Sequence, residues 1–63
     1  MKLTEALERM SEDHKRVFNA DYDGSPLQLW GDEDGCYVFA LEGLFDAGMQ
    51  WEFFKLDWVE KDG

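Results

Sequence analysis

Fifteen carboxylates, one histidine and one cysteine are the residues of this 63-residue chain that could do chemistry. The run Asn19-x-Asp21-x-Asp23-Gly24 matches the start of a calcium-binding loop, in which alternate oxygen ligands precede a glycine at a sharp turn. The last position of such a loop supplies a bidentate glutamate, but here that position is Trp30. The run is therefore more typical of an acidic turn between strands, and we expect neither a metal site nor a cofactor.

Catalysis by the histidine or the thiol would need neighbours that the sequence does not provide. His14 stands beside Lys15 and Arg16 at the predicted end of a helix, which is typical of a solvated or capping side chain. Cys36 begins an apolar run and lacks the basic neighbour that makes a thiol reactive, so we expect a buried, inert cysteine. A chain this short rarely encloses the cleft that a carboxylate pair needs for acid–base chemistry. We therefore expect a protein that is not an enzyme.

The distribution of the acids bears on the kind of partner. From Val17 to Phe54 the chain has eight carboxylates and no lysine or arginine, so this window holds nearly all of the net charge of −9. A folded surface with this imbalance attracts basic surfaces and repels phosphates, which disfavours both nucleic acid and anionic membranes as direct partners. The alternative interpretation is that the charge serves solubility. No apolar stretch approaches the roughly 20 residues of a membrane span, and we expect a cytoplasmic protein.

A short helix is predicted near the N-terminus, because apolar residues recur there at helical spacing. Its apolar stripe comprises Leu3, Ala6, Leu7 and Met10. Thr4 can cap the helix, and Glu5 lies in its first turn near the positive end of the dipole. Glu5 and Arg9 have the i, i+4 spacing of a favourable ion pair. We expect this helix to end near residues 13–15.

Strand patterns separated by turn signals follow the helix. The strand-like runs are residues 18–23, 27–30 and 36–41, and the turns between them are residues 23–26 and 31–35. The run 36–41 is almost wholly apolar, which predicts a central strand covered on both faces. Residues 49–58 alternate with one change of phase, which predicts a fourth strand with a β-bulge, and a helix over 46–58 is the competing interpretation.

The predicted fold is therefore α+β, with one N-terminal helix packed on a three- or four-stranded antiparallel sheet in a single domain over residues 1–63. One helix cannot cover both faces of a sheet in a chain with this many aromatic side chains. Some of these rings should be exposed or should contact another subunit. The candidates are Tyr22, Trp30, Tyr37, Trp51 and Trp58.

In size, charge and compact aromatic plan, the chain resembles the small acidic inhibitors that phages encode against bacterial defences, including anti-CRISPR proteins and other DNA mimics. The resemblance implies a non-enzymatic protein that occupies the nucleic-acid-binding groove of a host defence protein, such as a CRISPR effector subunit, in the bacterial cytoplasm. The stretches Leu3-Thr4-Glu5-Ala6-Leu7 and Lys15-Arg16-Val17, together with Trp58, are also similar to phage anti-defence proteins of the Thoeris type, which sequester nucleotide signals.

We expect the partner-binding residues to be acids of the base-free window together with two aromatic anchors that flank its most acidic loop. They are Asp21, Asp23, Trp30, Asp32, Glu33, Asp34, Tyr37, Glu42 and Asp46. Asp21 and Asp23 lie about 6.7 Å apart on one side of a predicted strand, and the loop 32–34 could lie alongside them. Eight carboxylates equal the charge on about 14 Å of duplex DNA, roughly four base pairs.

The expected partner is thus a basic, nucleic-acid-binding host protein. The alternative is a nucleotide-sequestering protein or a small homo-oligomeric module, for example a homodimer. That alternative would depend on Trp51, Trp58 and the pair Lys15-Arg16 rather than on the acidic loop.

Overall fold

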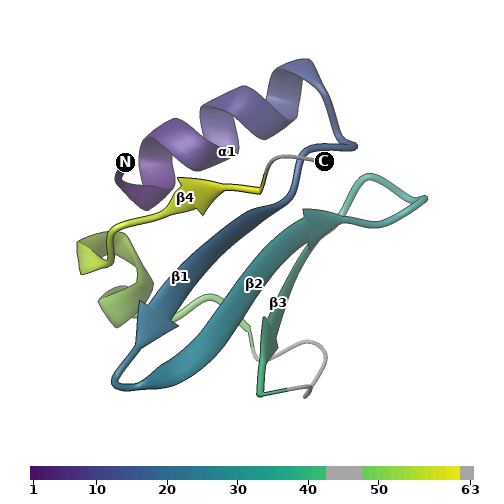
Figure 1. Cartoon of the computed structure of the whole chain (residues 1–63). Helices are drawn as coiled ribbons and strands as arrows, with labels where there is room; N and C mark the ends of the chain where they lie inside the picture. The colour runs from purple at the N-terminus through teal and green to yellow at the C-terminus, as the bar shows by residue number, and fades with distance from the viewer. Residues whose placement is uncertain (43–47, 62–63) are drawn as a thin grey trace.

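The computed structural model describes residues 1–42 and 48–61, which form one helix, one 3-10 helix and a four-stranded antiparallel sheet. The elements are α1 (Leu3–Glu12), β1 (Phe18–Tyr22), β2 (Ser25–Gly31), β3 (Tyr37–Leu41), the 3-10 helix η1 (Trp51–Lys55) and β4 (Val59–Glu60). The strand order is β3-β2-β1-β4, and α1 and η1 pack on the same face of the sheet (Figure 1). The predicted α+β fold with its N-terminal helix is confirmed.

The core lies between α1, η1 and this one face of the sheet. The helix buries Leu3, Ala6 and Met10, as their spacing predicts. The strands contribute every second residue, because successive side chains of a strand point to opposite faces. The other buried side chains of this core come from the strands, from η1 and from the residue just before β4; they are Phe18, Leu27, Leu29, Phe39, Phe53 and Trp58. The expected pair Glu5–Arg9 is present on the exposed side of the helix at 3.8 Å.

Trp58 is the largest fully buried side chain, and its indole closes the core at the edge formed by β4. Its Nε1–H donates to the carbonyl oxygen of Phe53 at 2.9 Å, so the polar atom of the ring is satisfied inside the core. The ring also packs edge-on against Phe39 and Phe53. One side chain thus joins β3, η1 and β4.

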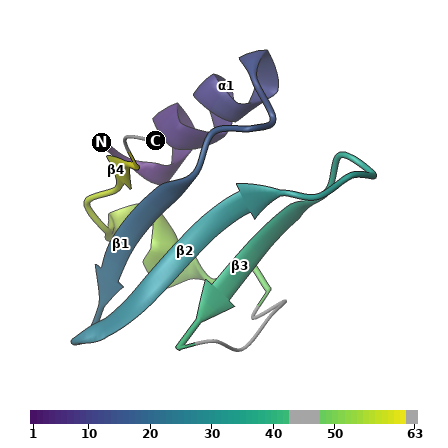
Figure 2. The same cartoon turned by 45° about the vertical axis from the view of Figure 1, so that its right-hand side comes forward.

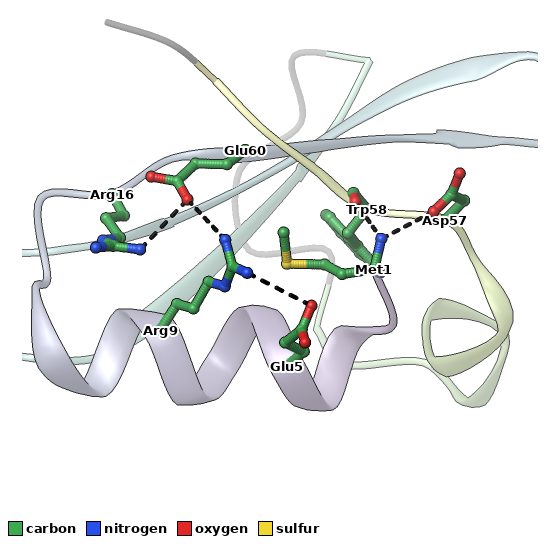
Figure 3. A network of polar contacts seen from close by, with 7 residues as sticks. All are labelled: Met1, Glu5, Arg9, Arg16, Asp57, Trp58 and Glu60. Carbon is green, nitrogen blue, oxygen red and sulfur yellow. Dashed lines mark hydrogen bonds and ion pairs between the residues drawn. The ribbon is translucent and has the colours of Figure 1, made fainter.

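The backbone of Met1 runs beside residues 57 and 58 and ties the two ends of the described chain together (Figure 3). The Trp58 N–H donates to the Met1 carbonyl at 2.7 Å, and the Met1 ammonium donates to the Trp58 carbonyl at 2.8 Å. The same ammonium contacts an Asp57 carboxylate oxygen at 2.9 Å. The start of α1 is therefore fixed by contacts with the opposite end of the sequence.

Glu60 of β4 receives two arginines on the helix side of the sheet (Figure 3). Its Oε1 lies 3.4 Å from Nη1 of Arg9 and 3.3 Å from Nη1 of Arg16. The three side chains are partly exposed, so each pair contributes only about 0–1 kcal/mol to stability. The pairs also mean that both arginines are already engaged by a carboxylate of the same chain.

Two local predictions for the first half of the chain are wrong. Thr4 is not the cap of α1: the helix begins at Leu3, and the cap position is held by Lys2 without a side-chain hydrogen bond. The ties between Met1 and residues 57–58 position this end instead. Cys36 is exposed rather than buried, because it precedes β3 instead of belonging to it.

Residues 36–41 were expected to be a central strand, but β3 lies at the edge of the sheet. Both of its faces are nevertheless apolar, since Val38 and Ala40 are buried on the side opposite Phe39. Val38 is paired with Trp30 of β2, whose large ring lies on that same side. The apolar run 36–41 therefore predicted the burial of residues 38–40 correctly, but not the exposure of Cys36 and Tyr37 or the position of the strand in the sheet.

The strand predicted over 49–58 is replaced by η1 and the two-residue β4. Among the alternating residues Met49, Trp51 and Phe53, only Phe53 is buried. The 3-10 turn brings both Phe53 and Trp58 into the core, where their rings contact each other and Phe39. The competing helix over 46–58 is also not formed over the described residues.

Exposure of some aromatic rings is confirmed: Trp51 is 85% exposed and Tyr37 36%, whereas Trp58 is 0% exposed. These values suggest a matched pair of stability tests. Replacing Trp58 by alanine should lower the free energy of unfolding by about 3–5 kcal/mol, because it empties the core and removes the bond to Phe53. Trp51→Ala should change it by less than about 0.5 kcal/mol. Urea denaturation measures both, and equal effects would contradict the central role of Trp58.

A second prediction concerns pH. A hydrogen bond from the Met1 ammonium, and then the attraction of its charge, hold the pKa of the exposed Asp57 carboxyl below its ordinary value. Because the folded pKa is the lower one, this pair stabilises the fold above the ordinary aspartate pKa, and the contribution is lost as pH falls through the folded value. N-terminal acetylation removes the ammonium charge and should raise the Asp57 pKa towards its ordinary value in an NMR titration. A pKa that stays low after acetylation would show that the ammonium is not the cause.

Candidate interaction surface

The face of the sheet opposite α1 is not covered by any helix among the described residues, and we call it the outer face (Figure 2). It consists of the alternate side chains that the core does not use. They are Asn19 and Asp21 of β1, Pro26, Gln28 and Trp30 of β2, Val38 and Ala40 of β3, and Val59 of β4. The outer face is therefore largely apolar along its centre, with the carboxylate of Asp21 near one end.

A hollow of about 320 Å³ lies on the outer face. Its main lining residues are Asn19, Pro26, Gln28, Trp30 and Ala40. Gln28 Nε2 donates to Asn19 Oδ1 at 3.2 Å, so the polar part of the lining is a hydrogen-bonded pair of amides. The volume is at the lower limit of small-molecule pockets and suits a single side chain of a partner. Trp30, half-buried on this face, is positioned as expected of an anchor.

Three carboxylates gather where β1 turns into β2 and where β3 ends, and we call Asp21, Asp23 and Glu42 the turn cluster. Asp21 Oδ1 accepts the N–H of Gly24 at 2.8 Å, which stabilises the turn. Glu42 Oε1 accepts the Ser25 hydroxyl at 2.8 Å and so lies beside the same turn. The Asp23 side chain is exposed.

Asp32, Glu33 and Asp34 form the second group, the loop cluster, between β2 and β3. Asp32 has a structural role, because its Oδ1 accepts the N–H groups of Asp34 at 2.9 Å and Cys36 at 2.8 Å. Glu33 and Asp34 project from the loop that Asp32 organises, and both are exposed. The sequence alone could not separate the structural carboxylate from the two free ones.

The two clusters lie at opposite ends of β2, so the expectation that the loop 32–34 lies alongside Asp21 and Asp23 is wrong. The six residue steps of β2 span about 20 Å at roughly 3.3 Å per residue. This exceeds twice the Debye length of about 8 Å at physiological ionic strength. The clusters therefore act as two separate anionic patches that bracket the outer face. Asp46, the ninth predicted site residue, lies outside the described residues.

The two predicted anchors, Trp30 and Tyr37, lie on opposite faces of the sheet. Tyr37 has the same strand parity as the buried Phe39, and its ring stacks on His14 with centroids 6.3 Å apart. The turn after α1 comes so close to the sheet here that a Cβ on Gly31 would lie 3.1 Å from the His14 carbonyl oxygen. Tyr37 therefore braces the helix side, and only Trp30 can act together with the outer face.

None of the carboxylates of the two clusters has an ion-pair partner among the described residues. The ion pairs found there join Met1 to Asp57, Arg9 to Glu5, and Arg9 and Arg16 to Glu60. All involve α1, the turn that follows it, or the segment around β4. The ion pairs of the described residues thus lie on the helix side or around β4, and the acids at the ends of the outer face take part in none of them.

In residues 1–42 and 48–61 no group of three or more possible ligands is arranged to hold a metal ion. The calcium-like run is divided between an extended strand, which holds Asn19 and Asp21, and the turn that holds Asp23. Over the same residues, no helix combines the length and apolar character needed to cross a membrane.

The chain matches no protein-family model, no curated protein and no solved structure.

The structural role of Asp32 can be separated from its charge. Asp32→Ala removes the acceptor of two backbone N–H groups and should destabilise the fold by about 1 kcal/mol, which lowers Tm by roughly 4–8 °C in a domain of this size. Asp32→Asn keeps an oxygen at the same place and should lower Tm by less than half as much. A thermal melt followed by circular dichroism checks both. Equal losses would mean that the charge, and not the hydrogen bonds, matters to the loop.

Proposed function

We propose that this chain is a non-enzymatic inhibitor that binds, through its outer face, the nucleic-acid-binding groove of a basic protein. The observation that carries the proposal is the arrangement of the outer face: an apolar hollow beside Trp30 lies between two acidic clusters, which have no cation partner among the described residues. Arginine and lysine side chains of a partner would pair with the clusters, and one apolar or planar side chain would enter the hollow.

The electrostatic part of this proposal concerns association more than affinity. Exposed carboxylates that face a basic surface raise the rate of encounter and align the partners, and this effect weakens as salt is added. The desolvated contact at Trp30 would supply the lasting interaction, because hot spots combine a buried aromatic anchor with a polar rim. The outer face has both parts, whereas the helix side has its arginines engaged by Glu60.

The extent of the nucleic-acid mimicry follows from the spacing. About 20 Å of duplex DNA carries roughly 12 phosphate charges, whereas the two clusters place six carboxylates in two groups over the same distance. The chain would therefore imitate two short runs of phosphates on either side of a groove rather than a continuous backbone. As the resemblance to small acidic phage inhibitors implies, we place the partner among bacterial defence proteins of the host cytoplasm, with a CRISPR effector subunit as the leading example.

A second candidate function is self-association through an exposed apolar patch at η1. Met49 is 51% exposed and Trp51 85%, and with Phe54 they line a hollow of about 260 Å³. A tryptophan exposed to this degree is often an interaction residue. Trp58 cannot contribute, because it is fully buried. The nucleotide-sequestering alternative loses part of its expected basic pair, since Arg16 is engaged by Glu60.

Charge reversal tests the inhibitor proposal. The double variant Glu33→Lys with Asp34→Lys reverses the loop cluster but keeps the structural Asp32, so the fold should be retained. A tagged wild-type chain should capture a nucleic-acid-binding protein from a bacterial lysate at low salt and lose it at high salt. The captured protein should then bind labelled duplex DNA less well when the wild-type chain is added, and the variant should compete roughly tenfold more weakly.

The matched control reverses two exposed acids of α1, Glu8→Lys with Glu12→Lys, which changes the net charge by the same amount on the helix side. Inhibition should persist in this control. If the control and the loop variant lose inhibition equally, net charge rather than the outer face is responsible. If neither loses it, and Trp51→Ala abolishes the interaction instead, the patch at η1 is the functional surface.

A further inference from the structure

The outer edge of β3 is a row of backbone groups that the sheet does not use. The Asp32 N–H donates to the Cys36 carbonyl and the Glu42 N–H to the Pro26 carbonyl, and these bonds fix which residues of the segment face β2. In an antiparallel pair such bonds occur at every second residue, here 36, 38, 40 and 42. The N–H and C=O groups of Tyr37, Phe39 and Leu41 therefore point away from β2, along the free edge.

Among residues 1–42 and 48–61, no backbone hydrogen bond reaches this edge. Natural edge strands are usually protected by charged side chains, proline, a bulge or short length. β3, with the sequence Tyr-Val-Phe-Ala-Leu, contains neither a charged residue nor a proline, and its pairing with β2 runs without a bulge. The opposite edge shows the contrast: β4 has two residues and contains Glu60. β3 is thus a ready template for one added strand.

The acidic groups at the two ends of β3 determine which kind of added strand could pair with its free edge. The loop cluster precedes β3, and Glu42 of the turn cluster follows it. A second copy paired antiparallel would place its Glu42 beside the loop cluster of the first, and a parallel copy would place the two loop clusters side by side. Both arrangements bring like charges together, which opposes pairing. An extended segment with an apolar centre and lysine or arginine at both ends meets opposite charges instead.

We propose that the free edge of β3 binds an extended, basic-ended segment of the partner as an added antiparallel strand. This inference rests on the proposed function for the basic character of the partner and adds the mode of binding. The N–H and C=O groups of Tyr37, Phe39 and Leu41 make the backbone bonds. Side chains of the added strand that point to the outer face lie beside Val38 and Ala40, and Ala40 also lines the hollow next to Trp30.

The test uses the whole chain and two synthetic peptides, Lys-Arg-Val-Thr-Val-Arg-Lys and the acidic control Glu-Glu-Val-Thr-Val-Glu-Glu. In the free protein, the amides of Tyr37, Phe39 and Leu41 should exchange hydrogen at least tenfold faster than those of Val38 and Ala40, which bond to β2. Saturation with the basic peptide should slow the first three amides at least tenfold. The acidic peptide should leave them unchanged.

A chemically synthesised chain with an N-methyl group on the Leu41 nitrogen provides a second variant, because it removes an outward donor and leaves the bonds to β2 intact. It should bind the basic peptide at least tenfold more weakly at unchanged Tm. Several outcomes would overturn the inference: slow exchange of Tyr37, Phe39 and Leu41 in the free protein, peptide binding without their protection, or a dimer in sedimentation whose edge amides are protected. If the lysate competition succeeds while the peptide fails, the proposed function stands and the edge is excluded. If the basic peptide protects the edge amides while the lysate competition fails, the edge binds basic segments and the proposed function is excluded.

Discussion

The burial of Trp58 beside the backbone of Met1 is the constraint on which the rest of this structure depends. A 63-residue chain without a disulfide has few ways to hold its ends, and a domain of this size is stable by only about 3–9 kcal/mol. Here the indole fills the core, bonds to the Phe53 carbonyl and positions β4 against β1, while the Met1 backbone bonds to the same residue. The helix, the 3-10 turn and the β4 edge of the sheet are therefore joined through contacts with the single residue Trp58.

Sequence periodicity was a good guide wherever a residue's environment is determined by its near neighbours. The stripe of α1 and the alternation of Phe18, Ala20 and Tyr22 predicted the core face of the helix and of β1. Periodicity failed after residue 48, because the positions of Phe53 and Trp58 are decided by contacts with residues distant in sequence, such as Phe39 and Met1. No local pattern distinguishes a bulged strand from a 3-10 turn that inserts two rings into the same core.

The candidate site was predictable in part. Turn residues correctly placed Asp23 and Asp34 between strands. The expectation that the loop 32–34 lies alongside Asp21 and Asp23 failed for a reason that lies in the topology of consecutive antiparallel strands. Successive hairpin turns of an antiparallel sheet alternate between its two ends, so a turn at residues 23–24 and a loop at 32–36 cannot lie together. Trp30 and Tyr37 lie on opposite faces of the sheet because Trp30 pairs with Val38, and Tyr37 is the adjacent residue in β3. The length of the loop between the two strands determines this pairing. Their placement thus depends on the register of the pairing, which the sequence did not reveal.

The distance between the two clusters also gives the surface a dependence on its medium. At about 0.01 M salt the Debye length is roughly 30 Å, longer than β2, and the carboxylates at both ends merge into one negative field. At physiological ionic strength the same groups present two separate fields with a neutral, apolar interval between them. Dilute buffer would therefore admit almost any cationic protein, whereas cellular salt would select partners whose own positive groups are about 20 Å apart. Under the proposed function, the length of β2 would thus help to determine which basic proteins the chain binds.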